Sequence, residues 1–126
     1  MSAYTDGFVI IVPKKNWDDY QEMAELASEV WIEYGALDYQ ECLGDDLEND
    51  DCGASFTGSL AVAPDEVVVF AWISYESREH RDIVNAKVMK DPRIEGMSQP
   101  EQMPFDSKRM LYGGFQNFVS RSAADR

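Results

Sequence analysis

The sequence predicts an α+β fold in which a four-stranded antiparallel sheet carries two helices on one face. The first observation is that residues 8–12 (FVIIV) and 67–73 (VVVFAWI) are apolar at every position. Successive side chains of a strand point to opposite faces, so a sheet with one solvated face would alternate apolar and polar residues. The second observation is that the chain offers only two substantial amphipathic helices, enough to cover one face. We therefore expect a second copy of the chain to cover the other face in a homodimer.

Length and charge narrow the classes of protein. A chain of 126 residues is expected to form one domain, residues 1–126. The net charge of −13 opposes binding to nucleic acids and anionic membranes, which depends on lysine and arginine. No apolar run approaches the roughly 20 residues of a transmembrane helix, and the N-terminus lacks the basic region of a signal peptide. We therefore expect a cytoplasmic location, with no nucleic-acid or membrane partner.

The first half of the chain is expected to fold as strand, helix and strand. Residues 4–12 are predicted to form the first strand. Asn16 is in position to cap a helix over residues 17–34, whose apolar residues fall on one broad face and whose glutamates fall opposite. Gly35 is a natural end for this helix. Residues 37–43 are predicted to form the second strand.

An acidic segment over residues 44–66 is predicted to be a long, solvated loop. The glycine and the final glutamate of an EF-hand calcium loop are not in register within it, so calcium binding is disfavoured. Cys42 and Cys52 are expected to be free thiols because nothing indicates secretion. With one histidine and no Cys-x-x-Cys pair, no metal site is expected.

The second half repeats the order of strand, helix and strand. The expected segments are a strand over 67–75, a helix over 78–90, an irregular connection over 92–107, a strand over 109–119 and a frayed tail over 121–126. Ser77 is in position to cap the helix. Together the halves give the order β-α-β-β-α-β, which is that of a ferredoxin-like sandwich.

His80 is the candidate catalytic residue. The sequence contains one histidine, and it shares a helix face with Val84 and Val88. We therefore expect its side chain to point toward the sheet. A neutral imidazole at a cavity wall can act as a general base or bind a ligand. The alternative is a histidine at a helix start that packs on the sheet and bonds to a backbone group. A lone histidine without a partner favours this structural role.

Four aromatic residues are candidate ligand-binding groups. We expect Trp72 and Tyr112 to border, together with His80, a small cavity between the helices and the sheet. Tyr39 and Tyr75 would line the same cavity. Aromatic side chains also suit strands without any ligand, so a purely structural role is the alternative for all four.

Arg109 is the charged candidate for ligand binding. A guanidinium can hold a carboxylate or phosphate through paired hydrogen bonds. The alternative is structural, with Asp106 capping the loop and Arg109 bridging to the partner chain. We favour the structural role because this block leads directly into a strand that must be oriented.

Several blocks of the sequence resemble the YbaA-like bacterial family, catalogued as domain of unknown function 1428. The resemblance covers nearly the whole chain and is most specific over residues 103–115. Its blocks include PKKN at 13–16, YGAL at 34–37, SREHRD at 77–82, MPFD at 103–106 and YGGF at 112–115. It implies a dimeric α/β barrel of ferredoxin-like fold and no established reaction.

Related dimeric α/β barrels include cofactor-independent monooxygenases and haem-degrading enzymes. Some of these are similar in placing a tryptophan on the third strand and a histidine on the second helix, as Trp72 and His80 would be here. They also use an asparagine near the start of the first strand, where this chain has Asp6 and Gly7. The resemblance therefore fails at a position that this chemistry needs.

Two functions from different classes remain. The first is a homodimer that binds a small, mostly apolar molecule between helices and sheet and needs no cofactor. The second is a cofactor-independent enzyme of the monooxygenase, isomerase or lyase type that uses His80. A cavity with His80 pointing into it would favour the enzyme, whereas a filled core would favour a binding or structural role.

Overall fold

Four antiparallel strands form an open sheet in the computed structural model, which describes residues 3–48, 53–97 and 103–125. The strands are β1 (Tyr4–Pro13), β2 (Asp38–Leu43), β3 (Glu66–Tyr75) and β4 (Leu111–Gln116). They lie in the order β2-β3-β1-β4, so the two long strands occupy the centre and the two short strands form the edges. The predicted antiparallel sheet of four strands is confirmed.

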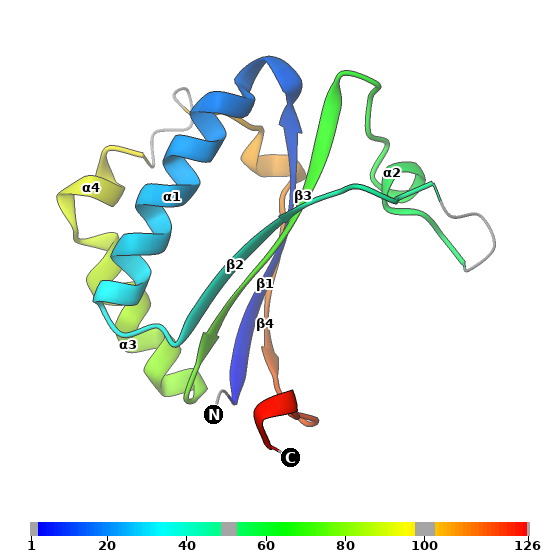
Figure 1. Ribbon diagram of the computed structural model, residues 1–126. Helices are drawn as coiled ribbons and strands as arrows, with labels where there is room; N and C mark the ends of the chain where they lie inside the picture. Colours follow the sequence, from blue (N-terminus) through cyan, green and yellow to red (C-terminus); the bar gives the residue numbers. More distant parts are fainter. Residues whose placement is uncertain (1–2, 49–52, 98–102, 126) are drawn as a thin grey trace.

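The helices divide unequally between the two sides of the sheet. Figure 1 shows α1 (Trp17–Glu33), α3 (Arg78–Met89) and the short α4 (Pro92–Glu95) on one side, and the single turn of α2 (Phe56–Ser59) on the other. The two long helices therefore cover one face, as the sequence predicts. Within the described parts of the chain, no helix combines the length and hydrophobicity needed to cross a bilayer.

Short helices lie where the sequence predicts irregular chain. Within residues 44–66, α2 is capped by Ser55, whose hydroxyl accepts a hydrogen bond from the backbone N–H of Gly58 at 3.0 Å. Within residues 92–107, α4 is capped by Asp91 and has Pro92 in its first turn. A 3₁₀ turn over 107–109 contains Arg109, so β4 is shorter than the predicted strand. A further 3₁₀ turn, Ala123–Asp125, lies in the predicted tail.

The two predicted helix caps have different outcomes. The Ser77 hydroxyl accepts a hydrogen bond from the backbone N–H of His80 at 3.0 Å, which confirms the cap of α3. The prediction for Asn16 is wrong, because its side-chain amide donates instead to the carbonyl of Pro104 at 3.1 Å. The chain enters α1 through a 3₁₀ turn, Lys14–Asn16, and the N–H of Trp17 bonds to the carbonyl of Lys14. Asn16 therefore lacks the extended backbone that a capping side chain needs.

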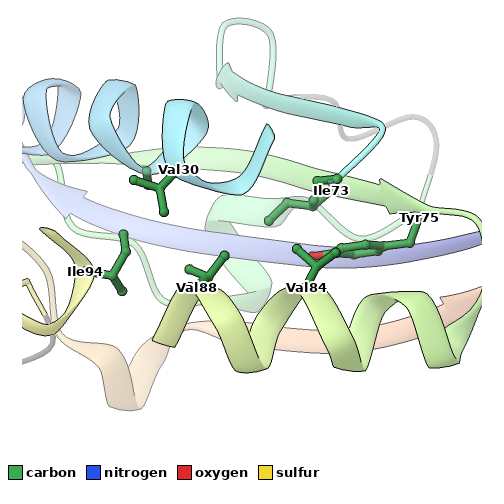
Figure 2. Close-up of a cluster of buried hydrophobic side chains, with 8 residues drawn as sticks. Val30, Ile73, Tyr75, Val84, Val88 and Ile94 are labelled. Atoms are coloured by element: carbon green, nitrogen blue, oxygen red, sulfur yellow. The ribbon is translucent and has the colours of Figure 1, made fainter. Parts of the chain in front are cut away.

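The main core lies between the sheet and the two long helices. Figure 2 shows its side chains converging from α1, β3, α3 and α4, and its members include Val30, Ile73, Tyr75, Val84, Val88 and Ile94. Val30, Tyr75 and Val88 are fully buried. Alternate residues of β1 and β3 supply the sheet side of this core, as the period of two in a strand requires.

The opposite face of the sheet is only partly covered by this chain. Phe56 of α2 packs edge-on against Phe70, with ring centroids 6.5 Å apart. Phe70, Leu111 and Phe115 nevertheless remain about half exposed or more, and this face is hollowed between β3 and β4. Both faces of β3 are thus apolar, but only one is fully covered. Helices cover one face, and α2 covers the other only in part.

Packing against the sheet should dominate the stability of α3. Val84 is 1% exposed, whereas its neighbour Ile83 is 49% exposed. The variant Val84→Ala removes two buried methyl groups and should lower the free energy of unfolding by about 1–3 kcal/mol. The control Ile83→Ala removes more carbon from the same helix and should change it by about 0.5 kcal/mol or less. Chemical denaturation measures both values, and a larger loss for Ile83→Ala would contradict this packing.

Candidate functional site

A cavity of about 450 Å³ lies between the helices and the sheet. Phe8, Ile10, Ala71 and Ile73 form its sheet side, because these positions of β1 and β3 face the helices. Five of the six methionines of the chain also line it: Met23, Met89, Met97, Met103 and Met110. The walls of this interior cavity are therefore mainly apolar, and its polar groups gather in two places.

The first polar group centres on Asp6 of β1. Its carboxylate is 1% exposed and pairs with the guanidinium of Arg81 from α3, Nη1 to Oδ1 at 2.5 Å. The same Nη1 donates to the hydroxyl of Tyr112 on β4 at 3.0 Å. The Arg81 guanidinium also lies over the ring of Tyr4, 5.0 Å from its centroid. Arg81 thus connects the second long helix to the two adjacent strands β1 and β4.

Opposing effects act on the pKa of Asp6. Burial raises it, because removal from water disfavours the charged form. The positive charge and hydrogen bond of Arg81, and hydrogen bonds with Tyr112 and Asn85, lower it. Burial is the largest effect, and the pKa of Asp6 lies above its ordinary value.

Asn85 of α3 extends this group toward α1 and β3. Its side-chain oxygen accepts hydrogen bonds from the indole N–H of Trp31 at 3.0 Å and from the hydroxyl of Tyr75 at 3.2 Å. Burial, followed by the negative charge of Asp6, raises the pKa of Tyr75. Asp6, Trp31, Asn85 and Tyr112 all line the interior cavity.

The second polar group centres on Glu41 of β2. The Tyr20 hydroxyl from α1 donates to its Oε1, and the Tyr39 hydroxyl donates to its Oε2 at 2.7 Å. Burial and then the negative charge of Glu41 raise the pKa of both tyrosines. All three residues line the interior cavity. We call them the Glu41 group, and we call Asp6, Arg81 and Tyr112 the Asp6 group.

The structure brings two of the predicted ligand-binding residues to this cavity. Tyr39 and Tyr112 line it. Tyr75 is fully buried on the same face and reaches the cavity indirectly, through its hydrogen bond to Asn85. Trp72 lies on the opposite face, beside Phe70 with ring centroids 5.6 Å apart, and lines the open hollow of the sheet.

His80 is held at the start of α3. Its Nδ1 accepts a hydrogen bond from the backbone N–H of Glu76 at 3.0 Å, and its ring meets Tyr75 edge-on. It is not among the residues that line the interior cavity. The arrangement in which His80, Trp72 and Tyr112 border one cavity is therefore not formed, because β3 turns Trp72 to the other face.

Arg109 makes an ion pair within its own chain. Its Nη1 bonds to Oε2 of Glu66 at 2.7 Å, and its Nη2 donates to the carbonyl of Ala61 at 3.2 Å. Hydrogen bonding to Arg109 and to the backbone N–H of Ala63 lowers the pKa of Glu66. Asp106 accepts a hydrogen bond from the backbone N–H of Lys108, which is the expected loop cap. These contacts fix the turn before β4 to the start of β3.

Among the residues that the structure describes, no group of three or more histidine, cysteine or acidic side chains is arranged to hold a metal ion. Cys42 is an exposed free thiol. Cys52 and the neighbouring Asp50 and Asp51 lie outside the described residues.

Sequence reasoning missed most of the polar side chains at the cavity. Asp6 is a single carboxylate in a strand that is otherwise apolar on its helix-facing side, which is one signal of a functional position. Arg81 and Asn85 are four residues apart and so lie on one face of α3. Glu41 shares a strand face with Tyr39, two residues away. The contact of Tyr20 with Glu41 has no signal in the sequence, because it forms only when α1 packs on the sheet.

Comparison with known proteins places the chain in a family. The family model of DUF1428, described as a protein of unknown function, matches residues 3–107. The chain belongs to this family. Proteins named "Uncharacterized protein YbaA" from Escherichia coli K12, Escherichia coli O157:H7 and Shigella flexneri are each 44% identical to it over 116 residues, 92% of this chain and 97% of theirs.

The DUF1428 match spans the residues of both polar groups except Tyr112. The descriptions of the family and of these relatives give no ligand or reaction. The structural evidence on function in this DUF1428 chain is therefore the cavity and its two polar groups.

The Arg81–Asp6 pair should be essential to the fold around the cavity. The variant Arg81→Met keeps an apolar stem but leaves the buried carboxylate without a cation, so the free energy of unfolding should fall by about 3–5 kcal/mol at neutral pH. The pKa of Asp6 should rise further, since the opposing charge is lost. Between the unfolded and folded pKa values the folded state then binds the proton more readily, so stability should partly return as the pH falls through that window.

Denaturant unfolding of Arg81→Met at neutral and mildly acidic pH measures both effects. Arg78→Met is the matched control, because Arg78 is exposed on the same helix, and it should change stability by about 0.5 kcal/mol or less. Adding Asp6→Asn to Arg81→Met should restore part of the loss. Equal losses for the two arginine variants would contradict the role of the ion pair.

Proposed function

We propose that the protein binds a small, mostly apolar molecule in the interior cavity. The observation that carries the proposal is the cavity itself, about 450 Å³ in volume with apolar walls and two separate polar groups. Ligand pockets typically measure about 300–1,000 Å³ and combine apolar walls with a few polar groups that orient the ligand.

The polar side chains of the cavity are already held in place. The cavity is partly open, and an ion pair and hydrogen bonds order the polar side chains in its wall. None of the described side chains has a buried polar atom without a partner. The polar groups are thus arranged before any ligand arrives, which lowers the entropic cost of binding.

His80 has no part in this proposal. Its Nδ1 is engaged by the backbone of Glu76, and it does not line the cavity. The geometry thus favours binding over catalysis by this histidine.

Filling the cavity should weaken binding while the protein remains folded. Ala27 of α1 lines the cavity, so Ala27→Leu should place three more carbon atoms inside it and weaken binding of the neutral fluorescent probe N-phenylnaphthylamine by about tenfold. Ala86→Leu is the control, since Ala86 is exposed on α3 and should leave affinity unchanged. Fluorescence titration gives the affinities. Unchanged binding by Ala27→Leu would argue against the cavity as the site.

We also propose that the domain is ferredoxin-like and pairs with a second copy through the open sheet face. In support, the sheet order places β1 and β3 at the centre, with a long helix following each of them. Phe70, Leu111 and Phe115 expose apolar surface on the open face. Large exposed apolar surface of this kind marks interaction sites.

The oligomeric state tests the second proposal. Sedimentation should give roughly twice the monomer mass, with an interface of more than about 1,000 Å². Phe70→Asp should shift the protein to monomer, because a charge at the centre of an apolar interface is left unpaired. Ile32→Asp is the control, since Ile32 on α1 is as exposed as Phe70, both at 47%. A wild-type monomer, or dissociation caused by both variants alike, would overturn the proposal.

A further inference from the structure

We propose that the Glu41 group recognises a protonated amine, so that the ligand is an apolar molecule carrying an ammonium group. The inference rests on the proposed binding function and names the chemistry of the ligand. Two observations carry it: the charges of the two polar groups, and the acceptor positions of Glu41 that no hydrogen bond from the described residues occupies.

The two carboxylates at the cavity differ in charge compensation. Asp6 is paired with Arg81 at 2.5 Å. Glu41 takes part in none of the ion pairs formed among residues 3–48, 53–97 and 103–125; its carboxylate contacts two neutral tyrosine hydroxyls. A carboxylate drawn partly out of water is unfavourable without a cation. A cationic ligand would supply the missing positive charge at this end of the cavity.

The hydrogen bonds of the Glu41 group select the same kind of ligand. A tyrosine hydroxyl has one proton to donate, and both Tyr20 and Tyr39 donate theirs to Glu41. Only acceptors remain: the second lone pairs of the two carboxylate oxygens and the oxygens of the two hydroxyls. An ammonium has three donors and no acceptor, so it complements this group. A carboxylate ligand offers only acceptors and would find no donor there.

The pKa shifts are consistent with this arrangement. Burial and the negative charge of Glu41 raise the pKa of Tyr20 and Tyr39. Both hydroxyls therefore keep their protons at neutral pH and continue to donate to the carboxylate. They offer a ligand only their oxygens as acceptors.

The surrounding side chains suit an apolar body attached to the cation. Phe105 meets the ring of Tyr20 edge-on, with centroids 5.8 Å apart, and lines the cavity beside Met23 and Ile10. Aromatic faces attract cations, and this attraction is stronger where water is excluded. The site thus joins an anionic, aromatic end to an apolar interior.

Three probes with the same phenyl-ethyl body but different head groups test the inference. Phenethylamine is protonated at neutral pH, like a lysine side chain; phenethyl alcohol is neutral, and hydrocinnamate is an anion. Isothermal titration with the wild-type protein should give an affinity at least about tenfold higher for the amine than for the alcohol. Hydrocinnamate should bind more weakly than the alcohol.

Glu41→Gln removes the charge and should reduce amine affinity by about tenfold or more while leaving alcohol affinity nearly unchanged. Glu29→Gln is the control, because Glu29 is exposed on α1 and the variant makes the same change in net charge. It should bind all three probes like the wild type. The comparison of probes on the wild type needs no variant, so it holds even if Glu41→Gln loses its fold.

The outcomes separate the two proposals. Equal binding of amine and alcohol, or preference for hydrocinnamate, would overturn the assignment of an amine and leave the binding function standing. Equal loss of amine affinity in Glu41→Gln and Glu29→Gln would also overturn it, since the effect would then be one of net charge. Binding of none of the probes would contradict both proposals.

Discussion

The long antiparallel ladder between β1 and β3 determines which side chains of the sheet face the helices. It runs without interruption from the pair Tyr4–Tyr75 to the pair Pro13–Glu66. In this register Asp6 lies beside Ile73 and Ile10 lies beside Val69, all on the helix-covered face. A shift of one residue would exchange the two faces of a strand. Such a shift of β1 would place Asp6 on the open side, away from Arg81, and the cavity would lose its Asp6 group.

Much of the fold is predictable because strong local patterns agree with the tertiary structure. The uninterrupted apolar runs mark the two central strands, and helical periodicity with Ser77 as cap marks α3. The helices α2 and α4 have only four residues each, too few for periodicity to distinguish them from loops. Asparagine is a favourable capping residue, but Asn16 lies in the 3₁₀ turn before α1. Its backbone is therefore not extended, and its side chain does not cap the helix.

The candidate site was less predictable, partly for a reason already present in the sequence. Trp72 and Tyr75 are three positions apart in one strand, and the period of two places them on opposite faces. They could not line the same cavity directly. The contacts that assemble the site have no local signal: Asp6 and Arg81 are 75 residues apart, and Tyr20 and Glu41 are 21 residues apart. Only helix packing brings these pairs together.

The five methionines of the cavity have a consequence for the range of molecules that fit. Methionine is unbranched, has three rotatable side-chain bonds and carries a polarisable sulfur, so it adjusts to irregular shapes at little energetic cost. The two polar groups, in contrast, are fixed by ion pairs and hydrogen bonds to strands of the sheet. The walls can therefore re-form around occupants of different breadth, while the spacing of the fixed groups stays constant. If the cavity binds a ligand as we propose, it should select molecules by their length and end groups and tolerate variation in their width.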